Sequence, residues 1–151
     1  MKKKKSQDKQ IIGWREYVHF PEWGVRNVRA KVDTGARTSS LHVDDIVLLK
    51  NNRIRFYVVL CGRDPLKRKK VVARRLRKGR VRSSTGAKTE RWYVKAKVSL
   101  GDVQRDIVIN LIDRGGMNFR MLLGRTAIDD SFLVDVDRSF LLGKKRKVVC
   151  R

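Results

Sequence analysis

Apolar and polar positions alternate along most of this chain, which is typical of short β-strands with one buried face. The alternation predicts roughly eight short strands, at residues 11–14, 17–20, 25–31, 54–60, 91–100, 107–112, 132–136 and 140–142. Residues 39–49 continue the pattern, with Leu41 and Val43 as inward positions. Turn-forming residues separate these segments, so we expect an all-β domain.

Turn-forming residues mark the ends of several predicted strands, and one segment interrupts the alternation. Residues 21–24 and the Gly101-Asp102 dipeptide are turn signals, so the segments on either side of each should form hairpins. Residues 62–80 interrupt the alternation, because a loop at 62–65 is followed by basic runs around a short apolar piece at 71–73. Residues 126–130 are predicted to form one or two helical turns, with Thr126 near the start.

The strand that ends at Asp33 carries the most informative chemistry. A carboxylate at the end of a buried strand must be paired, hydrogen-bonded or neutralised. Thr34 and Gly35 follow it, and glycine permits a tight turn. Asp-Thr-Gly is the centre of the aspartic-protease active site, where two carboxylates share a proton. The same tripeptide is favoured in ordinary turns, so a purely structural Asp33 is the alternative.

One Asp-Thr-Gly supplies one carboxylate, whereas an aspartic protease needs two. A chain of this length holds one lobe, so a two-fold axis would have to bring together Asp33 of two subunits. Thr34 would then lock the two loops across the axis through its hydroxyl, and Gly35 would let a substrate backbone approach. A symmetric homodimer is therefore expected.

The charge of the chain narrows the class of partner. Its 151 residues include 38 Lys and Arg against 15 Asp and Glu, a net charge of +23. This excess indicates an anionic partner such as nucleic acid, the ribosome, an acidic polypeptide or a lipid surface. Residues 1–10 form a basic arm and residues 144–151 a basic tail, which leaves residues 11–143 as the folded domain.

Other features exclude several classes of protein. Cys61 and Cys150 lack metal-ligand spacing, and both thiols are expected to be reduced. No apolar run suits a signal peptide or a membrane span, so we expect a cytoplasmic protein without membrane contact. His42 is interpreted as a structural hydrogen-bonding residue rather than a ligand or base.

The order of several motifs resembles the retropepsin family. The resemblance rests on residues 12–16, 30–42 around Asp33-Thr34-Gly35-Ala36, 81–86, Met-Leu-Leu-Gly-Arg at 121–125, 132–135 and 139–143. The chain is most similar to a bacterial and archaeal branch labelled ATP-dependent zinc proteases and found beside ATP-grasp glutamate ligases. The resemblance covers residues 11–143 and implies a retropepsin-like, closed or partly open β-barrel with one short helix, acting as a symmetric homodimer.

The residues support neither the ATP dependence nor the zinc in that label. ATP binding calls for a glycine-rich phosphate loop after a strand, and the sequence has none. Zinc calls for clustered His, Cys or carboxylates, but the only histidines are His19 and His42, without a His-Glu-x-x-His run. Neither a metal nor another cofactor is therefore expected.

The resemblance assigns roles to residues of this chain. Asp33 is the catalytic carboxylate, and Thr34 and Gly35 support the active-site loop. The predicted substrate-binding residues are Ala36, Arg37, Ser84, Gly86 and Arg125. A flap drawn from about residues 71–98 would close over the substrate.

Arg37 departs from the retropepsin pattern, in which an acidic residue at this place pairs with the arginine of the later Gly-Arg. Arg37 cannot pair with Arg125 in that way. We expect one of Asp44, Asp45, Asp129 or Asp135 to serve Arg125 instead. Alternatively, Arg37 points into the cleft and selects acidic side chains of the substrate.

Two functions follow from these observations. The leading prediction is an aspartic-type endopeptidase whose site is formed by Asp33 of two subunits, acting on an acidic or glutamate-rich peptide or protein. The branch's association with glutamate ligases suggests that substrate. The alternative is a non-catalytic, retropepsin-like binding module for RNA, the ribosome or an acidic protein, which would use the basic arms.

Overall fold

The computed structural model describes residues 8–60, 67–82, 85–113 and 119–143. These ranges contain ten strands, a 3-10 helix η1 (Pro21–Trp23) and an α-helix α1 (Arg125–Ile128). The strands are β1 (Gln10–Gly13), β2 (Arg15–Phe20), β3 (Val25–Val32), β4 (Ser39–Leu49), β5 (Arg53–Val59), β6 (Arg68–Arg82), β7 (Lys88–Leu100), β8 (Val103–Ile112), β9 (Met121–Leu123) and β10 (Phe132–Asp135). No helix within these ranges is long and apolar enough to cross a membrane.

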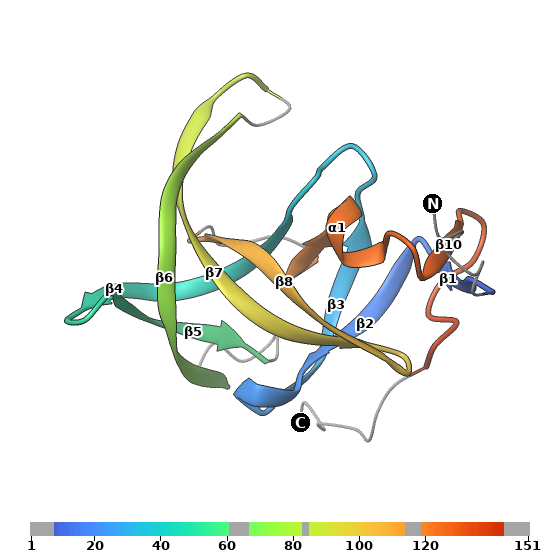
Figure 1. The fold of residues 1–151 in the computed structure, drawn as a ribbon, viewed down its shortest axis with the longest axis horizontal. Helices are drawn as coiled ribbons and strands as arrows, with labels where there is room; N and C mark the ends of the chain where they lie inside the picture. Colours follow the sequence, from blue (N-terminus) through green and yellow to red (C-terminus); the bar gives the residue numbers. More distant parts are fainter. Residues whose placement is uncertain (1–7, 61–66, 83–84, 114–118, 144–151) are drawn as a thin grey trace, which may run out of the picture.

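Most of the strands pair side by side in a ring. The order is β2, β3, β9, β4, β8 and β7, and β7 returns to β2 where Ser99 lies opposite His19. On the left of Figure 1, β5 and β6 form a second path from β4 to β7. The small parallel sheet of β1 and β10 lies on the right. The predicted β-rich architecture with one short helix is confirmed.

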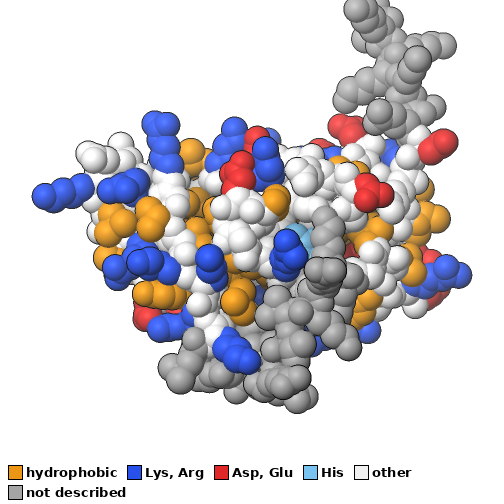
Figure 2. Space-filling view, turned by 90° about the horizontal axis from the view of Figure 1, so that it is seen from below, with side chains coloured by type: hydrophobic (Ala, Val, Ile, Leu, Met, Phe, Trp, Pro, Cys, Tyr) orange, Lys and Arg blue, Asp and Glu red, His pale blue; other side chains and the backbone are white. Residues whose placement is uncertain are grey.

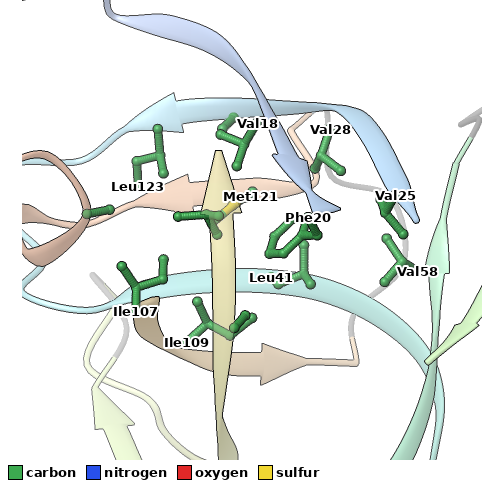
Figure 3. Packing of buried hydrophobic residues seen from close by; sticks show 14 of the residues in the cluster. Val18, Phe20, Val25, Val28, Leu41, Val58, Ile107, Ile109, Met121 and Leu123 are labelled. Carbon is green, nitrogen blue, oxygen red and sulfur yellow. The ribbon is translucent and has the colours of Figure 1, made fainter. Parts of the chain in front are cut away.

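The hydrophobic core lies inside the ring of strands. Figure 3 shows side chains from β2, β3, β4, β8 and β9 pointing toward one another, among them Phe20, Leu41 and Met121. Leu41 and Val43 are fully buried, as the alternation predicted. Burying this apolar surface is the main driving force for folding. The packed core therefore fixes the strands from which the loops extend.

The β2–β3 hairpin delivers Asp33, as predicted. Its turn is η1 followed by Gly24, whose φ of 64° lies in the left-handed region that favours glycine. Val28 and Ala30 of β3 are buried, and the strand ends at Val32. Because β3 pairs with β2 on one edge and β9 on the other, the strand that leads to Asp33 is fixed on both sides.

The prediction of an irregular segment through residues 62–80 is wrong for residues 68–80, which belong to β6. Residues 62–65 lie outside the described residues. The first half of β6, residues 68–74, pairs with β5, and the second half, residues 75–82, pairs with β7, so backbone groups along its length find partners in a neighbouring strand. Val71 is buried, while Lys and Arg occupy most of the outward positions, with Val72 and Leu76 among them. The alternation of apolar and polar residues does not reveal this strand, because most of its side chains remain exposed to solvent.

The strand predicted at residues 140–142 is also wrong. Residues in this segment lie against the β1–β2 corner and are held by the buried carboxylate of Glu16. Glu16 accepts hydrogen bonds from the backbone N–H groups of Gly13, Leu141 and Leu142, at 2.6, 3.1 and 3.2 Å. Hydrogen bonds to a charged acceptor are strong, so this carboxylate takes the place of a partner strand.

The interpretation of His42 as a hydrogen-bonding residue is wrong as well. His42 is only 2% exposed, and within the described part of the chain neither ring nitrogen has a hydrogen-bond partner. Burial lowers the pKa of this imidazole below its ordinary value, and Arg120 lowers it further, against the smaller opposing effects of Asp44 and Asp113. The fold therefore disfavours a proton on His42.

Candidate active site

The loop between β3 and β4, residues 33–38, is called the Asp33 loop here, and hydrogen bonds hold both the backbone and the carboxylate of Asp33 within it. The Asp33 N–H donates to the Leu123 carbonyl at 2.9 Å, which extends the β3–β9 pairing beyond the end of β3. The Ala36 N–H donates to the Asp33 carbonyl at 3.2 Å and closes a turn. The Gly35 N–H donates to Asp33 Oδ1 at 3.0 Å. Asp33 is thus held through its main chain and through one carboxylate oxygen.

Gly35 contributes space rather than an unusual backbone conformation. Its φ lies outside the left-handed region, so the turn does not depend on the conformational freedom of glycine at this position. A Cβ atom here would lie 3.2 Å from Asp33 Oδ1. The missing side chain therefore keeps one side of the carboxylate open, as a close substrate backbone would require.

The loop rests on β9 and α1. The Arg125 N–H donates to the Ala36 carbonyl at 2.8 Å, and the next N–H along the chain donates to the next loop carbonyl at 3.1 Å. A Cβ atom on Gly124 would lie 2.6 Å from the Thr38 carbonyl carbon. Only glycine lets the start of α1 approach the loop backbone so closely.

A buried polar network holds the far end of the loop. Asn110 on β8 donates through Nδ2 to the Ser39 carbonyl at 3.1 Å and accepts at Oδ1 from the Ser40 hydroxyl at 2.8 Å. Arg91 on β7 donates to the same Oδ1 at 3.0 Å. The Ser39 hydroxyl oxygen in turn accepts from the Gly124 N–H at 3.0 Å. One amide thus links the start of β4, directly after the Asp33 loop, to β7 and β8.

The side chain of Arg125 contacts the loop rather than a carboxylate. Its Nη1 donates to the Thr34 carbonyl at 2.9 Å. The expected acidic partner is therefore wrong: Asp44 and Asp45 contact Arg68, Asp129 contacts Arg105, and Asp135 contacts Arg138. The sequence could not reveal this, because each of the four carboxylates lies in the folded chain beside an arginine other than Arg125.

A cavity of about 500 Å³ opens beside the loop. It lies between the end of the loop, α1, the base of the β6–β7 hairpin and β8, and its lining residues are Arg37, Thr38, Leu76, Arg77, Asp106, Ile107, Val108 and Thr126. The β6–β7 register shifts between Arg75 and Arg77. Such a bulge re-aims side chains, so Leu76 and Arg77 can both reach the cavity.

The β6–β7 hairpin stands beside the loop as the predicted flap would. At the upper left of Figure 1 its far end projects beyond the rest of the fold. Gly86 lies there with a φ of 84°, and a Cβ atom on it would meet nothing within 4 Å. Ser84 lies outside the described residues. At the base of the hairpin the Arg77 guanidinium stacks on the Tyr93 ring, 3.9 Å from its centroid.

The structure brings together the predicted residues Asp33, Thr34, Gly35, Ala36, Arg37 and Arg125, whereas Gly86 stands apart at the hairpin end. Sequence reasoning gave no role to Asn110, Arg91 or Arg77. Asn110 could have been noticed, because it is the one polar residue within the apolar run at 107–112. Nothing in the sequence distinguishes Arg77 from its many basic neighbours.

Comparison with known proteins adds the family context. A family model described as "Retropepsin-like aspartic endopeptidase RimB" matches residues 11–145. A Shewanella pealeana protein named "Probable alpha-L-glutamate ligase" is 36% identical over 147 residues, covering 93% of this chain and 31% of that protein. A Desulfotalea psychrophila protein of the same name is 34% identical over 157 residues, covering 94% and 32%. This chain thus spans about a third of the length of these relatives.

A solved structure shares the fold. The crystal structure of a protein of unknown function from Legionella pneumophila matches with a TM-score of 0.73 and 27% identity. The match covers 90% of this chain and 99% of that one. The arrangement of strands around the Asp33 loop is therefore found in an experimentally determined relative.

Proposed function

The chain belongs to the RimB-like family of retropepsin-like aspartic endopeptidases, and from this membership we propose that it hydrolyses peptide bonds with Asp33 as its catalytic carboxylate. The observation that carries the proposal is the seating of the Asp33 loop on β9 and α1, with the carboxylate oriented by the Gly35 amide. A catalytic group has to be held in a fixed place, and this loop is fixed at both ends.

Two copies of Asp33 would perform the chemistry. Carboxylates about 3 Å apart cannot both ionise, so the pair keeps one proton. The charged group removes a proton from a water molecule, which attacks the peptide carbonyl, while the protonated group donates to the carbonyl oxygen. When the resulting tetrahedral intermediate collapses, the amine leaves with the proton that the first carboxylate took from water, and the second carboxylate takes back a proton from a hydroxyl of the intermediate, which restores the pair with one proton. Gly35 leaves the space in which the substrate backbone would lie.

The second Asp33 would come from a second copy of the chain, docked through the β1–β10 sheet. Ile11, Leu133 and Val136 on or next to this sheet are 54%, 55% and 73% exposed, and Ile11 lies opposite Leu133 in the pairing. This sheet adjoins the catalytic loop, because the Trp14 carbonyl accepts from the Val32 N–H at 2.9 Å. Covering these apolar side chains would offset the cost of association.

The proposed substrate is an acidic, glutamate-rich peptide or protein segment. Arg37 and Arg77 line the cavity next to the loop, against one carboxylate, Asp106. Stacking on Tyr93 holds the Arg77 guanidinium in place, so it loses little freedom when a carboxylate binds. Relatives named for glutamate ligation contain a segment similar to this whole chain, which supports glutamate as the recognised residue.

The ligase name itself belongs to proteins about three times as long as this chain. The present sequence lacks a glycine-rich phosphate loop after a strand, so we assign it no ligase activity. In our proposal this domain cleaves glutamate-rich chains that a ligase has extended, and the two activities oppose each other.

A mass-spectrometric cleavage assay tests the proposal. Wild type and Asp33→Asn are incubated with a peptide pool that contains glutamate-rich and neutral members, across acidic to neutral pH. We expect new fragments from wild type alone, since the asparagine amide cannot exchange a proton as the carboxylate does. Fragments from both proteins, or from neither in a dimeric sample, would remove the basis for Asp33 catalysis.

A second variant tests the acidic preference separately. Arg37→Ala should lower kcat/KM for glutamate-rich peptides by about ten-fold, roughly the loss of one charge-assisted hydrogen bond, and leave neutral peptides unaffected. Arg26→Ala is the matched control, because Arg26 is an exposed cation that does not line the cavity. An equal loss on both kinds of peptide would show that Arg37 does not select acidic side chains.

A further inference from the structure

The outward face of the β4–β5–β6 sheet is built from basic, apolar and aromatic side chains. We call it the β5 face, and it consists of Val47, Arg53, Arg55, Tyr57, Arg68, Lys70, Val72 and Arg74. Strand register places these side chains together, since Arg53 lies opposite Arg74, Arg55 opposite both Val47 and Val72, and Tyr57 opposite both Lys70 and the carboxylate-bearing Asp44. Residues directly opposite in a sheet share a face.

Most cations of the β5 face have no carboxylate partner. Among the described residues, Arg53, Arg55, Lys70 and Arg74 form no ion pair. The nearby carboxylates, Asp44 and Asp45, lie at one end, where both contact Arg68. The remaining cations repel one another across adjacent strands, an arrangement that an anionic ligand would relieve.

The middle of the β5 face is apolar. Val47 and Val72 are 38% and 44% exposed and flank Arg55. The Nε atom of Arg55 is buried and has no hydrogen-bond partner among the residues that the structure describes. Because this side chain is partly removed from water, solvent screens its attraction to an anion less than at an open surface.

An aromatic ring borders this apolar centre. The Tyr57 side chain is partly buried, and the Arg68 guanidinium lies over its ring at 4.5 Å from the centroid. Figure 2 shows the wider setting: on its left, over β4–β6, hydrophobic side chains lie among Lys and Arg side chains. Cations thus surround apolar and planar groups on one exposed sheet.

We propose that the β5 face binds single-stranded nucleic acid. The phosphates would contact Arg53, Lys70 and Arg74, and bases would lie on the apolar centre and on the planar Arg68–Tyr57 stack. Single-stranded nucleic acid combines a charged backbone with flat apolar bases, which matches a sheet that combines cations with apolar and planar groups. A glutamate-rich peptide offers carboxylates but no flat apolar group to lie on the valines and the Arg68–Tyr57 stack, so it fits this face less well.

The inference is independent of the proposed peptidase activity. The β5 face is made by β4–β6, and of its residues none lines the cavity beside the Asp33 loop. A variant of this face should therefore keep any cleavage of short peptides, and loss of Asp33 chemistry should leave nucleic-acid binding intact. The two proposals can fail separately.

Fluorescence anisotropy with a labelled twelve-nucleotide oligouridylate tests the inference. The triple variant Arg53→Gln/Lys70→Gln/Arg74→Gln should bind at least ten-fold more weakly than wild type at moderate salt, and the slope of log K against log salt should fall by about two, at roughly 0.7 per phosphate contact. The control Lys9→Gln/Arg26→Gln/Lys95→Gln removes the same charge from exposed positions elsewhere and should lose much less.

A second substitution probes the apolar centre at constant cation number. Val72→Glu places a carboxylate where bases are proposed to lie, and we expect it to abolish oligouridylate binding, whereas Val72→Thr should keep most of it. Val72 is exposed, so neither change should disturb folding, which thermal unfolding of each variant checks.

Three results would overturn the inference. One is the absence of oligouridylate binding by wild type. Another is an equal loss in the triple variant and its charge-matched control, which would reduce the binding to net charge. A third is a triple variant that no longer binds a poly-glutamate peptide but still binds the oligouridylate, which would make the β5 face a site for acidic polypeptide.

Discussion

The Asp33 loop and the far end of the β6–β7 hairpin are held very differently, although the base of that hairpin and the end of the loop line the same cavity. Backbone hydrogen bonds from β9 and α1, the Arg125 side chain and the Asn110 network all fix the loop. The hairpin end has Gly86 in the left-handed region with open space around it. If the proposed peptidase function is right, a firmly held Asp33 loop beside a hairpin with an open end is the arrangement expected where a lid closes over a fixed site.

The largest effect in this comparison should come from Gly124→Ala. The new methyl group would lie 2.6 Å from the Thr38 carbonyl carbon, and neither backbone can move without breaking the hydrogen bonds that seat the loop. We expect a loss of about 3 kcal/mol in the free energy of unfolding. Denaturant unfolding measures it, and a stability equal to wild type would show that the loop is not tightly seated.

Asn110→Ala should have the next largest effect. It removes the acceptor of the Ser40 hydroxyl, one acceptor of the Arg91 guanidinium and the side-chain donor to the Ser39 carbonyl, at a cost of about 2–3 kcal/mol. The exposed Gln104 on the same strand provides the control Gln104→Ala, which should change stability by less than about 0.5 kcal/mol. Similar losses in both variants would contradict the network.

The buried imidazole of His42 should make the free energy of unfolding depend on pH. Burial lowers its pKa in the folded protein, so below about pH 6.5 the unfolded chain binds a proton that the folded chain resists. The free energy of unfolding should therefore be largest above that pH and decrease as the pH falls. His42→Leu should flatten this dependence between pH 7.5 and 5, and identical slopes for both proteins would exclude His42 as its source.

The smallest effect on stability is expected at the hairpin end. Gly86→Ala forces a side chain into the left-handed region at a cost of about 1 kcal/mol, without a clash. In a flap, this strain would alter closure, so kcat/KM should change more than the melting temperature does. A loss of stability as large as that of Gly124→Ala would remove the contrast between the two regions.

The sequence predicted the parts of the site that one strand and its turn determine. The alternation that ends at Asp33 located the loop, and the Gly-Arg motif located its support. The partner of Arg125 was not predictable, because its choice of the Thr34 carbonyl depends on how β9 lies against the loop. β6 was missed for a related reason: its neighbours, not its own apolar pattern, make it a strand.

Mixing wild-type and variant subunits tests whether two chains contribute Asp33 to one active site. Wild type and Asp33→Asn are mixed in varying ratios, allowed to exchange, and assayed at constant total protein on a peptide that wild type cleaves. If both carboxylates are needed, an equal mixture should keep about a quarter of the wild-type activity, because only wild-type pairs are competent. Activity that falls linearly, to about a half, would contradict a shared site and assign the chemistry to single chains.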